Sequence, residues 1–147
     1  MAGEGKSFHD AGHSFPKPII EIDGKTMIQI VVENLDIAGN YIFICKKEHY
    51  EKYSMYELLN LINPACKIVE VVEKTEGAAK TLLLAKDLIN NDEELIIANS
   101  DQWVDWNNQH FLSYLRNNDA SGGIVTFIAT HPKWSFVKIN DKNEVLE

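Results

Sequence analysis

Apolar residues fall along the chain in short β-rich runs that alternate with longer segments of helical spacing. This alternation is typical of βαβ units and of a largely parallel sheet. It predicts a strand at 19–22, closed by the turn Asp23-Gly24, because Asp-Gly pairs favour tight turns. A helix is expected from about Thr26 to Ile37, where apolar residues recur every four positions.

The middle of the chain repeats the pattern. Buried strands are predicted at 41–45 and 67–72, where the runs are rich in β-branched and aromatic residues. A helix is expected after the first strand. Ser54 and Glu57 have the spacing of a capping box and predict its start. The second precedes a helix expected over 77–90. These elements predict an α/β domain.

The last third predicts one more helix and three strands. The helix is expected over 106–116, and the closing strands over 122–129 and 136–139. Before them, the run 95–98 is predicted to be a strand that delivers Asp101 at its carboxyl end. Ligands of open α/β folds bind at that edge of the sheet, so Asp101 is a candidate site residue.

Composition narrows the class of protein. The chain has 147 residues and a formal net charge of −8, which predicts one acidic domain and argues against a nucleic-acid backbone binder. Its two cysteines form no metal motif and are expected to be reduced core thiols. No apolar run has the length of a membrane helix, and the first residues lack a signal-peptide pattern, so a cytoplasmic location is expected.

The first residues form a glycine-rich segment, Gly3-Glu4-Gly5-Lys6-Ser7. Its last three residues match the end of a P-loop, but the earlier glycine and the preceding strand of that motif are missing. Consecutive backbone amides in such a loop still cradle phosphates well. A Gly- and Ser-rich N-terminal tail is the alternative on these residues alone.

A lysine between two prolines follows, in Phe15-Pro16-Lys17-Pro18. Proline fixes the backbone on both sides of Lys17, so its ammonium group is aimed rather than freely swinging. An aimed cation beside a glycine loop suits a triphosphate. An ordinary proline-rich turn with a solvated lysine is the alternative.

Four blocks together resemble one protein family: MAGEGKSF, FPKPIIEIDGKTMIQIVVENL, TEGAAKTLLLA and IIANSDQW. Their order and spacing are similar to those of the sugar-phosphate nucleotidyltransferases, the nucleoside-diphosphate-sugar pyrophosphorylases. The resemblance runs over residues 1–147. It implies an α/β, Rossmann-like three-layer sandwich with a mostly parallel mixed sheet, the GT-A-like nucleotide-diphospho-sugar transferase fold.

The resemblance also implies an activity. The family joins a sugar 1-phosphate to a nucleoside triphosphate and releases pyrophosphate, giving a nucleotide sugar for polysaccharide or cell-surface glycan biosynthesis. The expected partners are those two substrates and Mg²⁺, with neither nucleic acid nor membrane, and a homo-oligomer stays open. The implied roles are catalysis for Lys17 and Lys6, nucleotide binding for Ala2, Gly3, Gly5, Ser7, Glu76 and Gly77, and metal binding for Asp101.

The sequence departs from the family pattern in places. Ser7 stands where the family usually has an arginine, and Lys6 gives a point charge without the guanidinium fork. The family's first strand and its later part have no counterpart, so the chain is expected to be the nucleotide-binding portion. A non-catalytic nucleotide-binding module and a glycosyltransferase-like domain are the alternatives. A turn cap is the alternative for Asp101, and packing for Trp103, Trp106 and Trp134.

Overall fold

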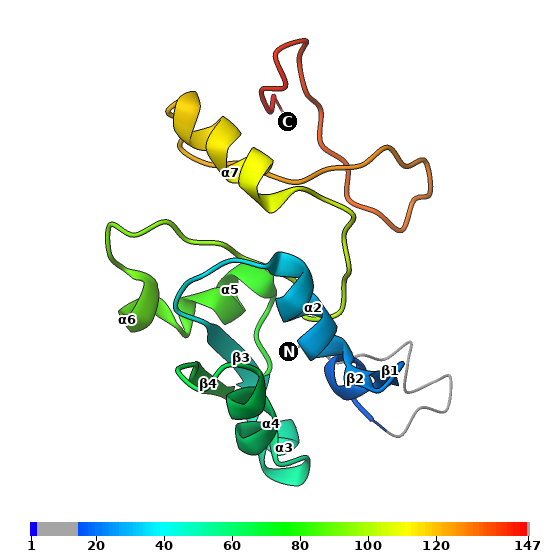
Figure 1. Ribbon diagram of the computed structural model, residues 1–147, viewed down its shortest axis with the longest axis vertical. Coiled ribbons are helices and arrows are strands. Elements are labelled where there is room, and N and C mark those ends of the chain that lie inside the picture. Colours follow the sequence, from blue (N-terminus) through cyan, green and yellow to red (C-terminus); the bar gives the residue numbers. More distant parts are fainter. Residues whose placement is uncertain (3–14, 147) are drawn as a thin grey trace. The chain divides into compact units, whose positions relative to one another are not determined.

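The computed structural model describes residues 1–2 and 15–146 (Figure 1). The chain divides into two compact units, Met1–Asn108 and Gln109–Glu147, and each is described by itself. Gly3, Gly5, Lys6 and Ser7 lie outside the described residues, so the roles predicted for the glycine loop stay predictions.

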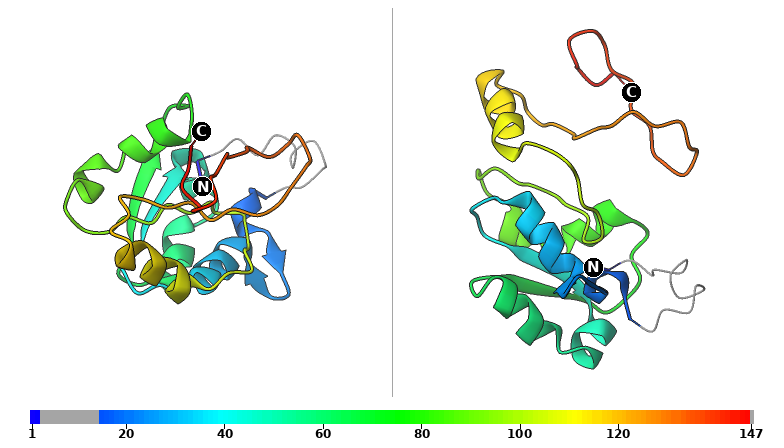
Figure 2. Two further views of the ribbon diagram at one scale, coloured as in Figure 1. Left: turned by 90° about the horizontal axis from the view of Figure 1, so that it is seen from above. Right: turned by 45° about the vertical axis from the view of Figure 1, so that its right-hand side comes forward.

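A parallel pair of strands forms the centre of the first unit. Strand β3 (Ile42–Lys46) pairs with β4 (Lys67–Val71), with Ile42 opposite Lys67 at one end and Lys46 opposite Val71 at the other. The two strands run side by side in both views of Figure 2. Helices α3 (Lys47–Lys52) and α4 (Met55–Ile62) connect them, as a parallel pair requires. The predicted α/β class with a parallel sheet is therefore confirmed.

The core of this unit gathers around β3. Phe43 and Cys45 are buried at alternate positions of the strand, because successive side chains of a strand point to opposite faces. Met55 and Leu59 of α4 and Ile28 of α2 (Met27–Leu35) pack with them. Burying each such side chain contributes about 1.5–3 kcal/mol, so this cluster anchors α2 and α4 to the sheet.

The predicted strand at 19–22 is only partly right. The 3₁₀ helix η1 covers Lys17–Ile19, and the short strand β1 (Glu21–Ile22) pairs antiparallel with β2 (Lys25–Thr26). Proline suits the first turn of a helix, and the Ile19 N–H donates to the Pro16 carbonyl over 3.0 Å. The Asp23-Gly24 turn is confirmed, since both residues have positive φ.

Two helix predictions need correction. The capping box at Ser54 is wrong, because Ser54 has a left-handed backbone (φ 47°) and its side chain makes no cap hydrogen bond. The helix expected over 77–90 is two helices, α5 (Ala78–Leu83) and α6 (Lys86–Ile89). The predicted helices near 26–37 and 106–116 are confirmed as α2 and α7 (Asn108–Asn117).

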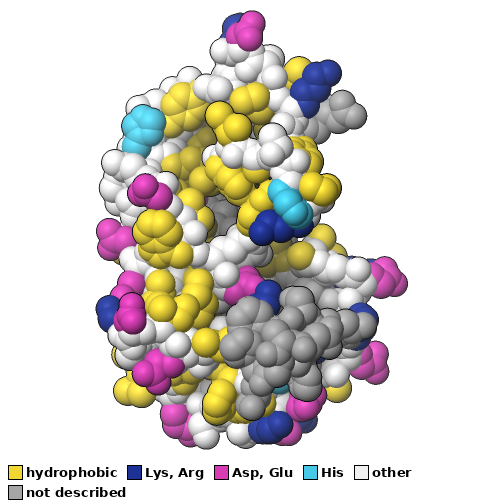
Figure 3. Space-filling model, turned by 90° about the vertical axis from the view of Figure 1, so that its right-hand side faces the viewer, with side chains coloured by type: hydrophobic (Ala, Val, Ile, Leu, Met, Phe, Trp, Pro, Cys, Tyr) yellow, Lys and Arg dark blue, Asp and Glu magenta, His cyan; other side chains and the backbone are white. Residues whose placement is uncertain are grey.

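The strands predicted at 95–98, 122–129 and 136–139 are not formed. A strand needs a neighbouring backbone to pair with, and composition does not supply one. Among the described residues of the second unit, 109–146, the pairing is reduced to one antiparallel bridge, Ile139 with Val145, around the predicted turn. Ile124 and Phe127 are 64% and 65% exposed, and Figure 3 shows hydrophobic side chains on the visible face of this unit.

Candidate nucleotide site

Lys17 is held by the backbone of η1. The Ile20 N–H donates to the Lys17 carbonyl over 3.3 Å, and Pro16 and Pro18 flank the residue. The prolines restrict the backbone on both sides, so the position from which the side chain leaves the chain is fixed. The Lys17 side chain is about one third exposed, at 32%.

Asp101 lies beside Lys17, although the two are far apart in the sequence. The Lys17 Nζ is 3.5 Å from the Asp101 Oδ2, and the Asp101 side chain is 37% exposed. A pair this exposed contributes about 0–1 kcal/mol to stability. The pair therefore matters for its chemistry more than for its stability. It places an ammonium beside a carboxylate, and both side chains are partly exposed.

The strand expected to carry Asp101 is absent, as described above. Asp101 instead lies in a turn with Ser100, and the Asn99 side-chain amide donates to Gln102 Oε1 across that turn over 2.8 Å. The prediction of a strand at 95–98 was wrong, yet the segment still brings Asp101 to Lys17. The role of Asp101 as a metal ligand stays a prediction.

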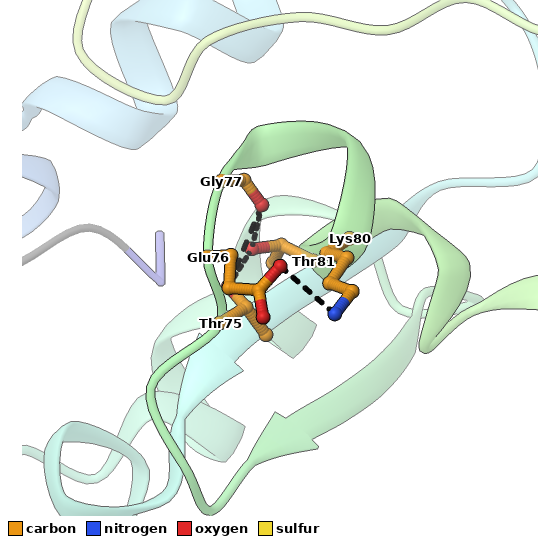
Figure 4. Close-up of polar contacts among 5 residues, drawn as sticks. All are labelled: Thr75, Glu76, Gly77, Lys80 and Thr81. Atoms are coloured by element: carbon orange, nitrogen blue, oxygen red, sulfur yellow. Dashed lines mark hydrogen bonds and ion pairs between the residues drawn. The ribbon is translucent and has the colours of Figure 1, made fainter.

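Glu76 and Gly77 lie directly before helix α5, in the segment that follows β4, and Gly77 is the N-cap residue of the helix (Figure 4). The Gly77 carbonyl accepts hydrogen bonds from the Thr81 N–H and from Thr81 Oγ1, each over 3.0 Å. Thr75 and Thr81 hydrogen-bond to each other through their hydroxyls. Glu76 Oε2 pairs with Lys80 Nζ at 2.9 Å, so the segment is tied to the helix that follows it.

The space beside Gly77 is open. A Cβ added to this residue would meet no atom within 4 Å. Its backbone is fully extended (φ 175°), a conformation that any residue adopts. The backbone conformation therefore does not require a glycine here. The lack of a side chain instead leaves the backbone uncovered at this position.

Sequence reasoning missed a group of polar contacts at the end of α2. The Asn34 Nδ2 donates to the Val104 carbonyl and the Val104 N–H donates to Asn34 Oδ1, both over 2.9 Å. The Trp106 Nε1 donates to the Asn34 carbonyl over 3.1 Å. The Asn108 Nδ2 donates to the carbonyls of Leu35 and Asp36. The indication in the sequence was the pair of side-chain donors, Trp106 and Asn108, at the start of a predicted helix.

A magnesium ion at Asp101 would take most of its ligands from substrate and water. Among residues 1–2 and 15–146, no group of three or more His, Cys, Asp or Glu side chains is placed to hold a metal ion. Magnesium, however, is commonly held by one or two carboxylates together with substrate phosphates and waters. The partly exposed carboxylate of Asp101 suits that arrangement.

The remaining predicted positions have simpler environments. Ala2 is half-buried. Cys45 and Cys66 are free thiols, as expected, and burial raises the pKa of the Cys45 thiol to about 11. Within the described part of the chain, no helix has the length and apolar character needed to cross a bilayer.

The comparisons with known proteins place these residues in a family. The family model described as "Nucleotidyl transferase" matches residues 1–145, so the chain belongs to the nucleotidyl transferase family. No solved structure matches it significantly.

The relatives include two archaeal proteins and one from a slime mould. The bifunctional protein GlmU of Methanocaldococcus jannaschii is 26% identical over 147 residues, covering 99% of this chain and 33% of that protein. GlmU of Methanococcus maripaludis is 30% identical over 129 residues, covering 84% of this chain and 30% of that protein. The mannose-1-phosphate guanylyltransferase catalytic subunit beta of Dictyostelium discoideum is 28% identical over 152 residues, covering 97% and 41%. The chain thus spans about a third of the length of the relatives it matches.

Proposed function

We propose that this chain is the nucleotide-binding part of a sugar-phosphate nucleotidyltransferase. The reaction joins a sugar 1-phosphate to a nucleoside triphosphate, releases pyrophosphate and yields a nucleotide sugar. Membership of the nucleotidyl transferase family supports the class of reaction. The printed name of one relative, a mannose-1-phosphate guanylyltransferase, supports a sugar 1-phosphate as acceptor.

The observation that carries the proposal is the approach of Lys17 to Asp101, at 3.5 Å between Nζ and Oδ2. Phosphoryl transfer needs little covalent work from the protein, since positioning and charge neutralisation supply most of the rate. In the proposed site, the Lys17 ammonium binds phosphate oxygens of the triphosphate. Asp101 holds Mg²⁺, which neutralises further charge on those oxygens when bound.

The nucleoside is proposed to lie beside Gly77. The extended backbone there has open space at the Cβ position, and this supports the approach of a nucleobase to the peptide plane. Glu76 is proposed to take part in nucleotide binding with Gly77, while its ion pair with Lys80 holds the start of α5. A cytoplasmic location is part of this proposal.

The first prediction concerns the Asp101→Asn variant. It keeps the size of the side chain and removes the charge that would hold the metal. We expect Mg²⁺-dependent binding of a fluorescent nucleoside triphosphate to weaken at least about tenfold, in the range of lost metal-site contacts. Binding without Mg²⁺ should change little. The measurement is a fluorescence titration with and without the metal.

Asp92→Asn is the matched control, because Asp92 is exposed and lies in a loop with no proposed role. Unchanged metal dependence in Asp101→Asn would remove Asp101 from the site. Turnover is followed as pyrophosphate released with each nucleoside triphosphate and a panel of sugar 1-phosphates. Triphosphate binding without pyrophosphate from any pair would favour the non-catalytic module over the transferase.

A further inference from the structure

The segment that carries Asp101 is fixed to the carboxyl end of α2 by the Asn34 side chain. Both atoms of its amide group are used, with Nδ2 bonded to the Val104 carbonyl and Oδ1 to the Val104 N–H at 2.9 Å each. This is the pairing that one residue of a strand offers to another. It docks the backbone three residues after Asp101 on a half-buried helix position.

Two further donors close the same end of the helix. Trp106 Nε1 bonds to the Asn34 carbonyl over 3.1 Å, and Asn108 Nδ2 bonds to the Leu35 and Asp36 carbonyls over 3.0 and 2.6 Å. The last carbonyls of a helix have no partner within the helix. Trp106 and Asn108 therefore bond to carbonyls at the end of α2, and the same bonds hold the segment 104–108 against the helix.

The other end of α2 is attached to the element that carries Lys17. The Met27 N–H at the start of the helix donates to the Ile20 carbonyl over 2.9 Å, just after η1. Ile19 of η1 also packs against the core cluster that contains Ile28. One rigid helix thus connects the backbone of Lys17 with the backbone that follows Asp101.

We propose that Asn34 is a positioning residue, which holds Asp101 within reach of Lys17 and so sets the spacing of cation and carboxylate in the proposed nucleotide site. It contacts no substrate in this role and acts through Val104. The metal-binding consequence rests on the proposed function. The spacing itself does not, and it is tested separately.

The spacing is tested by zero-length crosslinking of the whole chain. A water-soluble carbodiimide joins a lysine amine to an adjacent carboxylate as an amide, with loss of water, and the Lys17–Asp101 product is quantified by mass spectrometry. Asn34→Leu removes both hydrogen bonds to Val104 without adding charge. We expect a severalfold lower yield of this product, while the Lys80–Glu76 product, from a pair at 2.9 Å, stays unchanged.

The matched control is Asn60→Leu. Asn60 is also on a helix and also donates from its amide to a backbone carbonyl, that of Tyr56. It should leave the Lys17–Asp101 yield at the wild-type level. Should Asn34→Leu fail to fold, Asn34→Asp keeps the size of the side chain and removes the Nδ2 donor to the Val104 carbonyl, and a lower yield is again expected.

The site consequence is measured by triphosphate titration in Mg²⁺. Loss of a partner that orients a metal ligand typically costs about 10–100-fold in metal affinity, so Asn34→Leu should raise the half-saturating Mg²⁺ concentration about tenfold. Triphosphate binding without Mg²⁺ should be unchanged, and Asn34→Leu should add nothing in the Asp101→Asn background.

The outcomes separate the two claims. A wild-type chain that binds no triphosphate with Mg²⁺ overturns the proposed function, and the crosslink yield still decides the spacing. A folded Asn34→Leu with the wild-type crosslink yield overturns the positioning role. Equal loss of triphosphate binding with and without Mg²⁺ also overturns it, because that pattern marks general damage to the fold.

Discussion

His49 occupies a partly buried position in α3 among positive charges. Burial lowers the pKa of the His49 imidazole from its usual value, Lys46 and Lys52 lower it further, and Glu48 opposes the shift. Its ring also meets Tyr53 edge-on, with centroids 6.0 Å apart. The native state therefore favours the neutral form of this side chain.

This shift predicts a pH dependence of stability. Below the unfolded pKa of about 6.5, the unfolded chain binds the His49 proton more readily than the native chain. The free energy of unfolding therefore decreases as the pH falls from the unfolded-state pKa of His49 to its lower native-state pKa. His49→Gln should show a smaller decrease between pH 7.5 and pH 5.5 in urea unfolding followed by circular dichroism.

Asn90→Gln gives the comparison for this experiment. Asn90 is exposed and its side chain carries no titrating group, so this variant should keep the full decrease of the wild type. If His49→Gln also keeps the full decrease, His49 is not a source of the pH dependence.

At the scale of the elements, the joint between α3 and α4 contains avoidable strain. Ser54 has φ 47° and ψ 46°, and its hydroxyl makes no cap hydrogen bond. Its carbonyl accepts the Leu58 N–H over 3.3 Å, and a glycine would keep that bond. The left-handed conformation costs an L-residue about 1–2 kcal/mol, whereas glycine adopts it freely.

Ser54→Gly should therefore stabilise the protein. The gain is expected to be about 0.5–1 kcal/mol, because the greater freedom of glycine in the unfolded chain offsets part of the relief. Thermal unfolding followed by circular dichroism measures it. Ser113→Gly, in the interior of α7, should instead lower the melting temperature, since glycine is a poor helix former there. A lower melting temperature for Ser54→Gly would contradict the strain.

Local patterns predicted the elements that local forces decide. Strands β3 and β4 and helix α2 follow from apolar runs and spacing, and the turn before α2 follows from the Asp23-Gly24 pair. The capping box failed at Ser54 because a serine and a glutamate at the right spacing do not fix the backbone angle of the serine. The run 95–98 failed because a strand is decided by a partner far away in the chain.

For the candidate site, the sequence indicated the residues but not their arrangement in space. Sequence singled out Lys17 and Asp101 by chemistry and by resemblance, but their separation of 3.5 Å depends on two distant segments meeting at α2. Asn34 had no indication of its own, because a single asparagine in the last turn of a helix is ordinary. Only the fold shows that its amide group is aligned with the backbone at Val104.

At the scale of the whole molecule, exposed apolar side chains are the main liability. In the second unit, Ile128 is fully exposed and Phe127 is 65% exposed, in a run with high β propensity and no strand pairing. Short exposed apolar runs of this kind pair between molecules. The net charge of −8 opposes association, since like-charged molecules repel.

Two substitutions at Ile128 separate these effects. Ile128→Lys and Ile128→Glu both interrupt the apolar run, but the lysine reduces the net negative charge and the glutamate increases it. Because the Ile128 side chain is fully exposed, neither should change the melting temperature appreciably. If apolar pairing causes association, both variants lower light scattering at high protein concentration, as charged residues do in such runs. A decrease with glutamate alone would assign association to net charge, and no decrease with either would show that this run is not where the molecules meet.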